Sequence, residues 1–448
     1  MKKNVLVTVS GIAILGGIAW FGAHHAERVM VDKGIERFKQ ALGPDVSFTY
    51  TRAKPGLLGR SVRFYGLVFR QGPETMTADE AELSKPDTQD SDVTRIHHLS
   101  SRNFQPADPA GSLHLATVEM DDLALPTRTE DPAAPTMQSL SIGHVQATGL
   151  HGFASALQSD IAADTAAMDN FGANEASHLQ ARNVSLSTDV APPRHVHADS
   201  IVVDGVALAD LYTSLTTGAP YSAHISSTTR DITIDRLSMD GTTPLMRAKR
   251  VLSHATHTDA TEQEVSSIQE LELRPDVPNM GWLPSLGYDH FVGNVVLNDT
   301  YTPKTGTLHV ETLSIDSANM GRLHINGEFT QAASASMLNG NNADMQVTSM
   351  TMTYIDHGLV PRALGAIAAA RGLPPQAFVA FVQSQSATAQ NPAYAGFFRW
   401  LGNPGKQTLS IGIKPDQPMP LMQVVATLGN LASMPELAKQ IGLSVQAH

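Results

Sequence analysis

The spacing of apolar residues changes twice within the first 50 residues, and each change predicts a different element. Residues 5–23 form an uncharged, mostly apolar run that would span roughly 28 Å as a helix, close to the ~30 Å hydrocarbon core of a bilayer. Through residues 24–44, apolar side chains recur at helical spacing, and Gly43 and Pro44 end this pattern. We therefore predict a membrane-spanning helix followed by a stalk helix.

From residue 45 to residue 355 the dominant period is two, which is typical of β-strands. The predicted strands cover 46–50, 61–69, 78–84, 113–125, 137–150, 177–188, 195–206, 231–241, 245–258, 265–276, the hairpin 306–330 and 345–354. Gly66 interrupts one of them and predicts a bulge or a bend. Between the strands we expect a polar loop over 86–111 and helices over 154–171 and 207–216.

A loose unit recurs within the predicted strands. It consists of apolar-x-apolar, two spacer residues, and apolar-x-apolar again, and it occurs in 113–125, 137–150, 177–186 and 230–237. One interpretation is a single long meandering sheet built from repeated strands. The other is that any β-rich domain has this texture. In the hairpin 306–330, apolar residues of the second strand share one face, which is typical of a sheet buried on one side.

The character of the chain changes at Asp356, which is a good helix N-cap. The segments that follow predict helices over 359–371, 375–385, 392–401, 419–432 and 435–441, and strands over 409–413 and 443–447. We therefore expect a mixed α/β region at the carboxyl end.

Together these patterns predict a mainly β (α+β) fold. An amino-terminal transmembrane helix precedes an elongated, mostly antiparallel curved sheet, and a mixed α/β region caps its carboxyl end. The predicted divisions are a cytoplasmic tail (1–4), a transmembrane anchor (5–23), a stalk helix (24–44), a β-rich periplasmic body (45–355) and the carboxyl-terminal region (356–448).

Charges around the apolar run predict its orientation. Lys2 and Lys3 precede the run, and basic residues stay in the cytoplasm, so the amino terminus is expected inside and the body in the periplasm of a bacterial inner membrane. The alternative is a cleaved signal peptide, which needs small residues at the cleavage site. Trp20 and Phe21 occupy that region and no good A-x-A site follows, which favours the anchor.

Composition excludes several classes of function. The chain has 448 residues, 31 basic against 43 acidic, for a net charge of −12. This balance disfavours nucleic acid and a broad electrostatic grip on anionic lipid, so any further membrane contact should be apolar or narrowly local. The chain contains no cysteine, so disulfides, thiolate nucleophiles and cysteine metal sites are impossible.

The residues offer few candidates for chemistry. The motifs of serine hydrolases, zinc proteases, P-loops and dinucleotide-binding folds are absent. The histidine clusters are His97-His98, His195-x-His197, and His254-x-x-His257 with Asp259. Each offers fewer ligands than a metal site needs, so surface histidines are the expected interpretation. A carboxylate pair for acid–base chemistry would have to come from Asp316, Asp344 and Asp356, although turns and caps also favour aspartate. We predict no catalytic, cofactor-binding or metal-binding residue and no cofactor.

The region from Gly287 to Leu364 resembles a known family. Its segments are GYDHFVG, MGRLHINGEF and TYIDHGLVPRAL, and residues 397–415, FFRWLGNPGKQTLSIGIKP, fit the same pattern. These segments are similar to uncharacterised, inner-membrane-anchored envelope proteins of proteobacteria. The anchor and the β-rich texture are also similar, more distantly, to AsmA-like and TamB-like proteins. That second resemblance implies a long curled sheet with an apolar groove, associated with lipid movement across the periplasm.

These observations lead to three hypotheses about function. The leading one is a non-enzymatic, membrane-anchored periplasmic protein of envelope maintenance that shields lipid along an apolar sheet face. The second is a periplasmic scaffold that binds another envelope protein through sheet edges or carboxyl-terminal helices. The third is a hydrolase of envelope polymer, which would need a carboxylate pair of perturbed pKa in a cleft. The expected partners are the bilayer, through the amino-terminal helix, and phospholipid or another envelope protein, but not nucleic acid.

Overall fold

The computed structural model describes most of the chain beyond residue 45. The described residues are 46–55, 61–71, 74–84, 86–87, 93–108, 111–126, 141–154, 158–188, 193–211, 229–332, 344–388, 392–430 and 437–448. The predicted anchor (5–23) and stalk helix (24–44) lie outside these residues. Among the helices that are described, none combines the length and the apolar character needed to cross a membrane.

The chain divides into two compact units. The first ends at Asp235 and includes Met239–Thr242, and the second comprises Arg236–Ser238 and Thr243–His448. The strands up to the boundary are β1 (Val46–Thr49), β2 (Arg52–Pro55), β3 (Ser61–Gln71), β4 (Glu74–Ser84), β5 (Pro86–Asp87), β6 (Val93–Asp108), β7 (Gly111–Pro126), β8 (Ser141–Ala154), β9 (Ser159–Phe171), β10 (Ser177–Thr188), β11 (Arg194–Val206) and β12 (Thr229–Asp240).

The sheet of the first unit is an antiparallel meander. β3 pairs with β1 and β2 on one side and with β4 on the other, and β4 pairs with β6. Each strand from β6 to β11 then pairs with the next strand in sequence. The prediction of a mainly β fold with antiparallel strands is confirmed.

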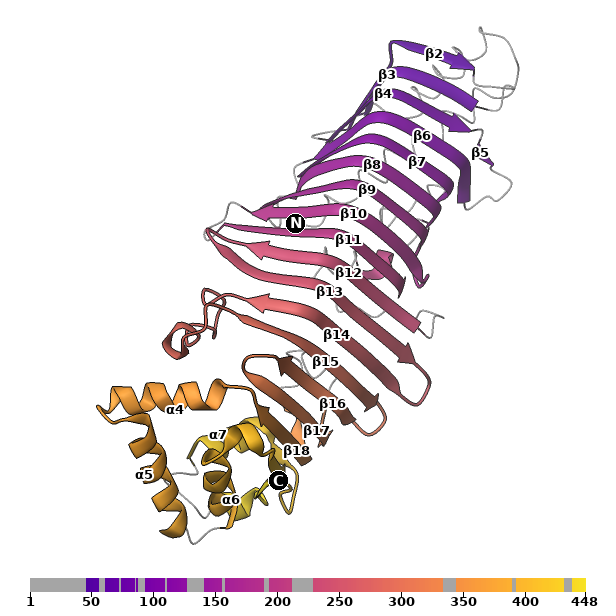
Figure 1. Ribbon diagram of the computed structural model, residues 1–448. Coiled ribbons are helices and arrows are strands. Elements are labelled where there is room, and N and C mark those ends of the chain that lie inside the picture. Colours follow the sequence, from indigo (N-terminus) through magenta and orange to yellow (C-terminus); the bar gives the residue numbers. More distant parts are fainter. Residues whose placement is uncertain are drawn as a thin grey trace. The chain divides into compact units, whose positions relative to one another are not determined.

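Strands β6 to β11 bend partway along their length (Figure 1), and left-handed residues mark the bend. Positive φ angles occur at Gly66 in β3, Asn103 in β6, Gly149 in β8 and Asn183 in β10. The register places these residues in one row across the sheet. A left-handed residue turns the backbone without continuing the pleat, so each strand changes direction at the same level. The bend predicted at Gly66 is confirmed.

The same rows explain the repeated unit in the sequence. In β10, Leu179 and Ala181 precede two spacers, and Val184 and Leu186 follow them. The second spacer is the left-handed Asn183, so the apolar residues on both sides point to the same face although their spacing is odd. A second row of left-handed residues lies nearer the other end of the strands, at Asp122, Asn170 and Gly205. In β10 the repeated unit therefore has a structural cause, which favours the single meandering sheet over a general β-rich texture.

Two predicted elements are wrong, and the reason is physical in both. The predicted loop over 86–111 contains the 16-residue strand β6, whose apolar side chains Ile96, Leu99 and Phe104 break the two-residue period at the bends. The predicted helix over 154–171 contains the strand β9, in which alanines supply small side chains that pair with β8 and β10. Tertiary pairing outweighs the helix propensity of alanine there. Of the predicted helix 207–216, residues 208–211 are helical and the rest lies outside the described residues.

One face of this sheet holds the core of the first unit. Between β3 and β7 most inward side chains are buried, among them Phe64, Leu83, Ile96 and Leu123, none of which is accessible to solvent. We use "inner rows" for the positions on this face and "outer rows" for those on the opposite face. Polar side chains occupy most of the outer rows because water covers that face.

The left-handed row predicts a specific effect on stability. Asn183 has φ +50°, and its amide donates to Asp164 Oδ2 at 2.5 Å. We expect Asn183→Val to lower the free energy of unfolding by about 1–2 kcal/mol or more, because a β-branched residue is strained there and the bond is lost. Asn183→Gly removes the bond but relieves the strain, and it should cost less. Urea denaturation of both variants checks this, and equal losses would contradict the assignment of the bend.

An ion pair joins β3 and β4 on the outer face. Ser61 Oγ donates to Glu82 Oε1 at 2.6 Å, and Arg63 Nε donates to Glu82 Oε2 at 2.9 Å. The hydrogen bond from Ser61 and, after it, the Arg63 guanidinium hold the pKa of Glu82 below its ordinary value against the opposing effect of burial. The carboxylate is thus more stable in the folded chain than in the unfolded chain.

This pKa fixes the sign of a pH dependence. A lowered folded-state pKa contributes stability above the ordinary glutamate pKa of about 4.3, and the contribution disappears as the pH falls through the folded-state value. Glu82→Gln should therefore lower the free energy of unfolding at pH 7 by about 1 kcal/mol or less, since both partners are partly exposed. Urea titrations at pH 7 and pH 3 check this. A penalty that stays the same at pH 3 would contradict it.

The second unit combines a sheet with helices. Its strands are β13 (Pro244–His257), β14 (Glu262–Leu273), β15 (Phe291–Thr302), β16 (Thr307–Ser317), β17 (Gly321–Thr330), β18 (Gln346–Asp356), β19 (Leu409–Ile413), β20 (Met419–Pro420) and β21 (Ser444–Ala447). Its helices are α4 (Leu359–Ala370), α5 (Pro375–Thr388), α6 (Pro392–Leu401), α7 (Leu421–Asn430) and α8 (Leu437–Gln440), with the short 3₁₀ turns η3 (Pro284–Leu286) and η4 (Pro404–Lys406).

The strands from β13 to β19 pair antiparallel in sequence order, and β21 pairs with β19. The predicted hairpin is confirmed as β16 and β17, with Phe329 fully buried on the apolar face. Val424 of α7 and Ile441 pack on the core formed by this sheet. The prediction of a mixed α/β carboxyl-terminal region is confirmed.

Candidate functional site

The most extensive candidate site is an apolar surface on the inner rows of β8 to β11. The register places on this face, among others, four apolar residues of each strand. They are Ile142, Val145, Ala147 and Leu150 of β8, Ile161, Ala163, Ala166 and Met168 of β9, Leu179, Ala181, Val184 and Leu186 of β10, and Val196, Ala198, Ile201 and Val203 of β11. All sixteen are apolar.

These side chains differ in burial from the rest of the same face. The closed core of the first unit covers the inner rows of β3 to β7 and extends into β8, where Ile142 and Ala147 are buried in it and Val145 and Leu150 pack against it. Among the sixteen residues of β8 to β11, eleven are only half-buried, including Leu179, Leu186, Ile201 and Val203. The surface is therefore apolar, free of charge and partly open, which is the arrangement that an acyl chain or another apolar chain can cover.

The outer rows of the same strands carry a line of alternating histidine and aspartate. The register pairs each residue with its neighbour on the next strand in the order His98, Asp121, His144, Asp169, His178 and Asp204. The Nδ1 atoms of His98 and His144 lie 2.7 and 2.5 Å from Oδ1 of Asp121 and Asp169, and His178 bonds Asp204. We call this line the His–Asp row.

The His–Asp row was not predicted from the sequence. Successive histidines are two strands apart, about 10 Å, which is too far for two nitrogens to share a metal ion at about 2 Å. No group of three or more histidine or acidic side chains placed to hold a metal ion occurs among the described residues. The row therefore acts as a set of cross-strand polar pairs on a solvated face.

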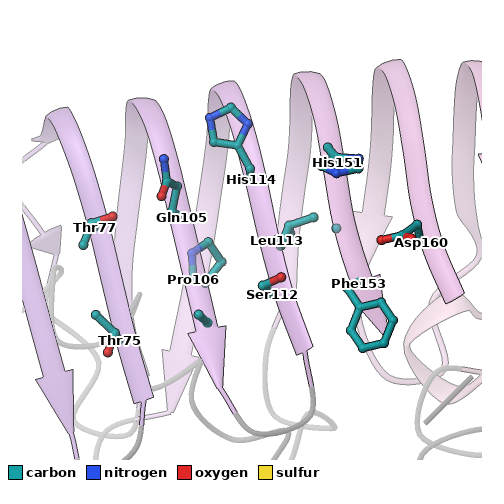
Figure 2. Close-up of a pocket in the computed structure, with 12 residues that line it drawn as sticks. Thr75, Thr77, Gln105, Pro106, Ser112, Leu113, His114, His151, Phe153 and Asp160 are labelled. Carbon is teal, nitrogen blue, oxygen red and sulfur yellow. The ribbon is translucent and has the colours of Figure 1, made fainter. Parts of the chain in front are cut away.

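A shallow hollow of about 350 Å³ lies on the outer face of β4 and β6 to β9 (Figure 2). Gln105, His114, His151 and Asp160 line it, with Phe153, whose exposed fraction is 42%. His114 and His151 are direct partners on β7 and β8. The lining mixes polar side chains with apolar ones such as Leu113 and Phe153 and contains a single carboxylate, so it offers no carboxylate pair.

The histidines singled out from the sequence bond separate partners. His97 lies against Asp122, His195 against Ser187 Oγ, His197 against Asp199 and His257 against Glu262. His195 and His197 share the outer face of β11, but His195 bonds a residue of β10 and His197 bonds a residue of its own strand. None of these interactions joins two histidines, which agrees with surface positions rather than a metal centre.

A second candidate site forms where the family-like segments meet in the second unit. Tyr288 Oη donates to Asn319 O at 3.0 Å, and Tyr354 Oη donates to Met320 O at 2.8 Å. Asp356 accepts from Gly358 N and from Val360 N at the start of α4. The segments GYDHFVG, MGRLHINGEF and TYIDHGLVPRAL therefore converge on one turn, residues 317–321. We call this cluster the tyrosine junction.

The electrostatics of the tyrosine junction favour a structural role. Burial and, after it, the Asp356 carboxylate raise the pKa of Tyr354 well above its ordinary value. Burial also raises the pKa of Tyr288, against the opposing charge of Arg362, whose guanidinium lies 4.3 Å from the ring centroid. Both phenols therefore stay protonated at neutral pH and act as donors, which disfavours a role as base.

The predicted carboxylate candidates do not form a pair by their described contacts. Asp316 is half-buried and binds Arg322 at 2.7 Å, whereas Asp356 is buried and accepts from Val360 N in the first turn of α4. Asp344 is exposed at the entrance to β18. The N-cap position predicted for Asp356 is wrong, because α4 begins at Leu359 and Gly358 is its N-cap. The Asp356 carboxylate instead accepts from the amides of Gly358 and Val360 from two residues before the N-cap.

The comparisons with known proteins support the resemblance in the carboxyl-terminal region only. A family model described as an uncharacterized protein matches residues 314–448. This match confirms that the region is similar to a family without an assigned activity. A search of curated proteins found no match.

Proposed function

We propose that this protein is a non-enzymatic, inner-membrane-anchored protein of the cell envelope that shields lipid acyl chains along the inner rows of β8 to β11. The observation that carries the proposal is the run of sixteen apolar residues, most of them half-buried, on one face of four neighbouring strands. Removing such a surface from water is favourable by roughly 25 cal/mol per Å².

Two further features support this proposal. The remote resemblance to AsmA-like and TamB-like proteins implies an apolar groove of the same kind. The uncharged segment 5–23 would keep the sheet near a bilayer, which is a source of lipid. Periplasmic localisation, with the amino terminus in the cytoplasm, is part of the same proposal.

Native mass spectrometry of the full chain, purified in mild detergent, tests the proposal. We expect masses of the chain with bound phospholipid, which persist after exchange into a second detergent. A chain free of lipid, which instead yields one dominant protein partner on crosslinking, would favour a scaffold and overturn the proposal.

A further inference from the structure

The carboxyl-terminal helices differ from the rest of the chain in charge. Residues 357–448 contain six lysine or arginine residues and two acidic residues, a net charge of +4, whereas the whole chain has a net charge of −12. No charged residue occurs within α5 or α7. The basic residues lie elsewhere in this region, for example Arg371 directly after α4, Lys414 after β19 and Lys439 on α8.

The same helices carry the most exposed apolar side chains in the described part of the chain. Met422 and Val425 of α7 are 69% and 53% exposed, and Phe381 of α5 is 50% exposed. Ile367 of α4 and Leu373, between α4 and α5, are also exposed. Exposed apolar side chains on uncharged helices, with basic residues nearby, are a combination that binds anionic lipid surfaces.

The packing of α7 fixes which of its faces is available. Val424 is fully buried and Leu428 packs with the core of the second unit. Met422 and Val425 lie three residues apart on the opposite side of the helix and face solvent. One apolar face of α7 therefore packs on the sheet, and a second apolar face is exposed to solvent. Figure 1 shows α4 to α7 gathered after β18 at the carboxyl end of this unit.

From this combination we infer that the carboxyl-terminal helices dock on the surface of an anionic lipid bilayer through Met422, Val425 and Phe381. The local net charge of +4 selects the occupant, because it attracts anionic lipid to the exposed apolar helices although the chain as a whole is acidic. Docking concerns a membrane surface, so it is independent of lipid binding on the inner rows of the first unit.

The absence of cysteine allows a position-specific test in the full chain. Met422→Cys and Phe381→Cys each carry one environment-sensitive fluorophore, and Ala260→Cys in the exposed β13–β14 turn is the matched control. We expect the labels at 422 and 381 to shift to the blue and to be quenched by brominated acyl chains in phosphatidylglycerol-containing vesicles. Binding should be about tenfold or more weaker to pure phosphatidylcholine and should fall with added salt. The control label should not respond.

Three results would overturn the inference. The first is that the labels at 422 and 381 respond to neither kind of vesicle. A chain that attaches to vesicles only through residues 5–23 would give this result. The second is an equal response to both kinds of vesicle, since the charge would then play no part. The third is a blue shift without vesicles that grows with protein concentration, which would identify a second copy as the occupant.

Discussion

Val203→Asp is expected to remove most of the phospholipid that co-purifies with the chain, whereas Val202→Asp is expected to leave it unchanged. Val203 pairs with Leu179 on the inner rows, and Val202 pairs with Gln180 on the outer rows. The two valines are neighbours on β11 and both are half-buried, so they form a matched pair. A carboxylate on the inner rows would have to lose its hydration against acyl chains, which is strongly unfavourable.

The measurement is the molar ratio of phospholipid to protein by mass spectrometry. Thermal unfolding of both variants is the control, since each places a carboxylate at a half-buried position of the same strand. Equal lipid loss in two folded variants would contradict the assignment of the lipid to the inner rows. If Val203→Asp unfolds and Val202→Asp does not, Val203→Ser replaces it in the test. The serine variant should lower the lipid content to a smaller extent.

Asp356→Ala is expected to lower the free energy of unfolding of the second unit by about 2 kcal/mol. The carboxylate is buried and accepts from Gly358 N, Val360 N and the Tyr354 hydroxyl. Alanine leaves the amides of Gly358 and Val360 short of an acceptor, whereas the Tyr354 hydroxyl keeps Met320 O. Loss of a buried acceptor costs about 1–3 kcal/mol.

Trp400 offers a local measurement of this effect, because its ring lies edge-on to Tyr354 at 5.9 Å between centroids. In a chain with Trp20 and Trp282 replaced by Phe, Trp400 fluorescence during urea denaturation reports on this unit. The control is Asp316→Ala, which removes an exposed pair with Arg322 and should cost less than about 1 kcal/mol. A similar decrease in the free energy of unfolding in both variants would contradict a special role of Asp356 in stabilising the tyrosine junction.

Most strands could be predicted because their period-two patterns are local. β10 and β11 agree with the predicted segments to within a residue, and so does the hairpin of β16 and β17. β6 was not predicted because bends interrupt its two-residue period, one of them at the left-handed residue Asn103. A strict alternation of apolar and polar residues therefore does not run through this segment. The alanines of β9 signal a helix by propensity, and only pairing with both neighbours makes them a strand.

The two candidate sites differ in how far the sequence predicts them. The apolar inner rows follow from the repeated unit once the spacers are understood as bends. The His–Asp row depends on register between strands, so residues such as Asp121 and His144 look unrelated along the chain. The three histidines each lie five residues before the left-handed residue of their strand, Asn103, Gly149 or Asn183, and this common spacing is the signal that the sequence holds. The tyrosine junction joins segments more than 30 residues apart, which local patterns do not connect.

The central claim is that lipid lies against the inner rows, and photocrosslinking from β11 tests it most directly. A benzoyl-phenylalanine placed at Val203 in the full chain, irradiated in intact cells, should yield the chain covalently joined to phospholipid. The same group at Val202 should yield none. Crosslinks to lipid from Val202 but not from Val203, or from neither position in folded protein, would contradict the account.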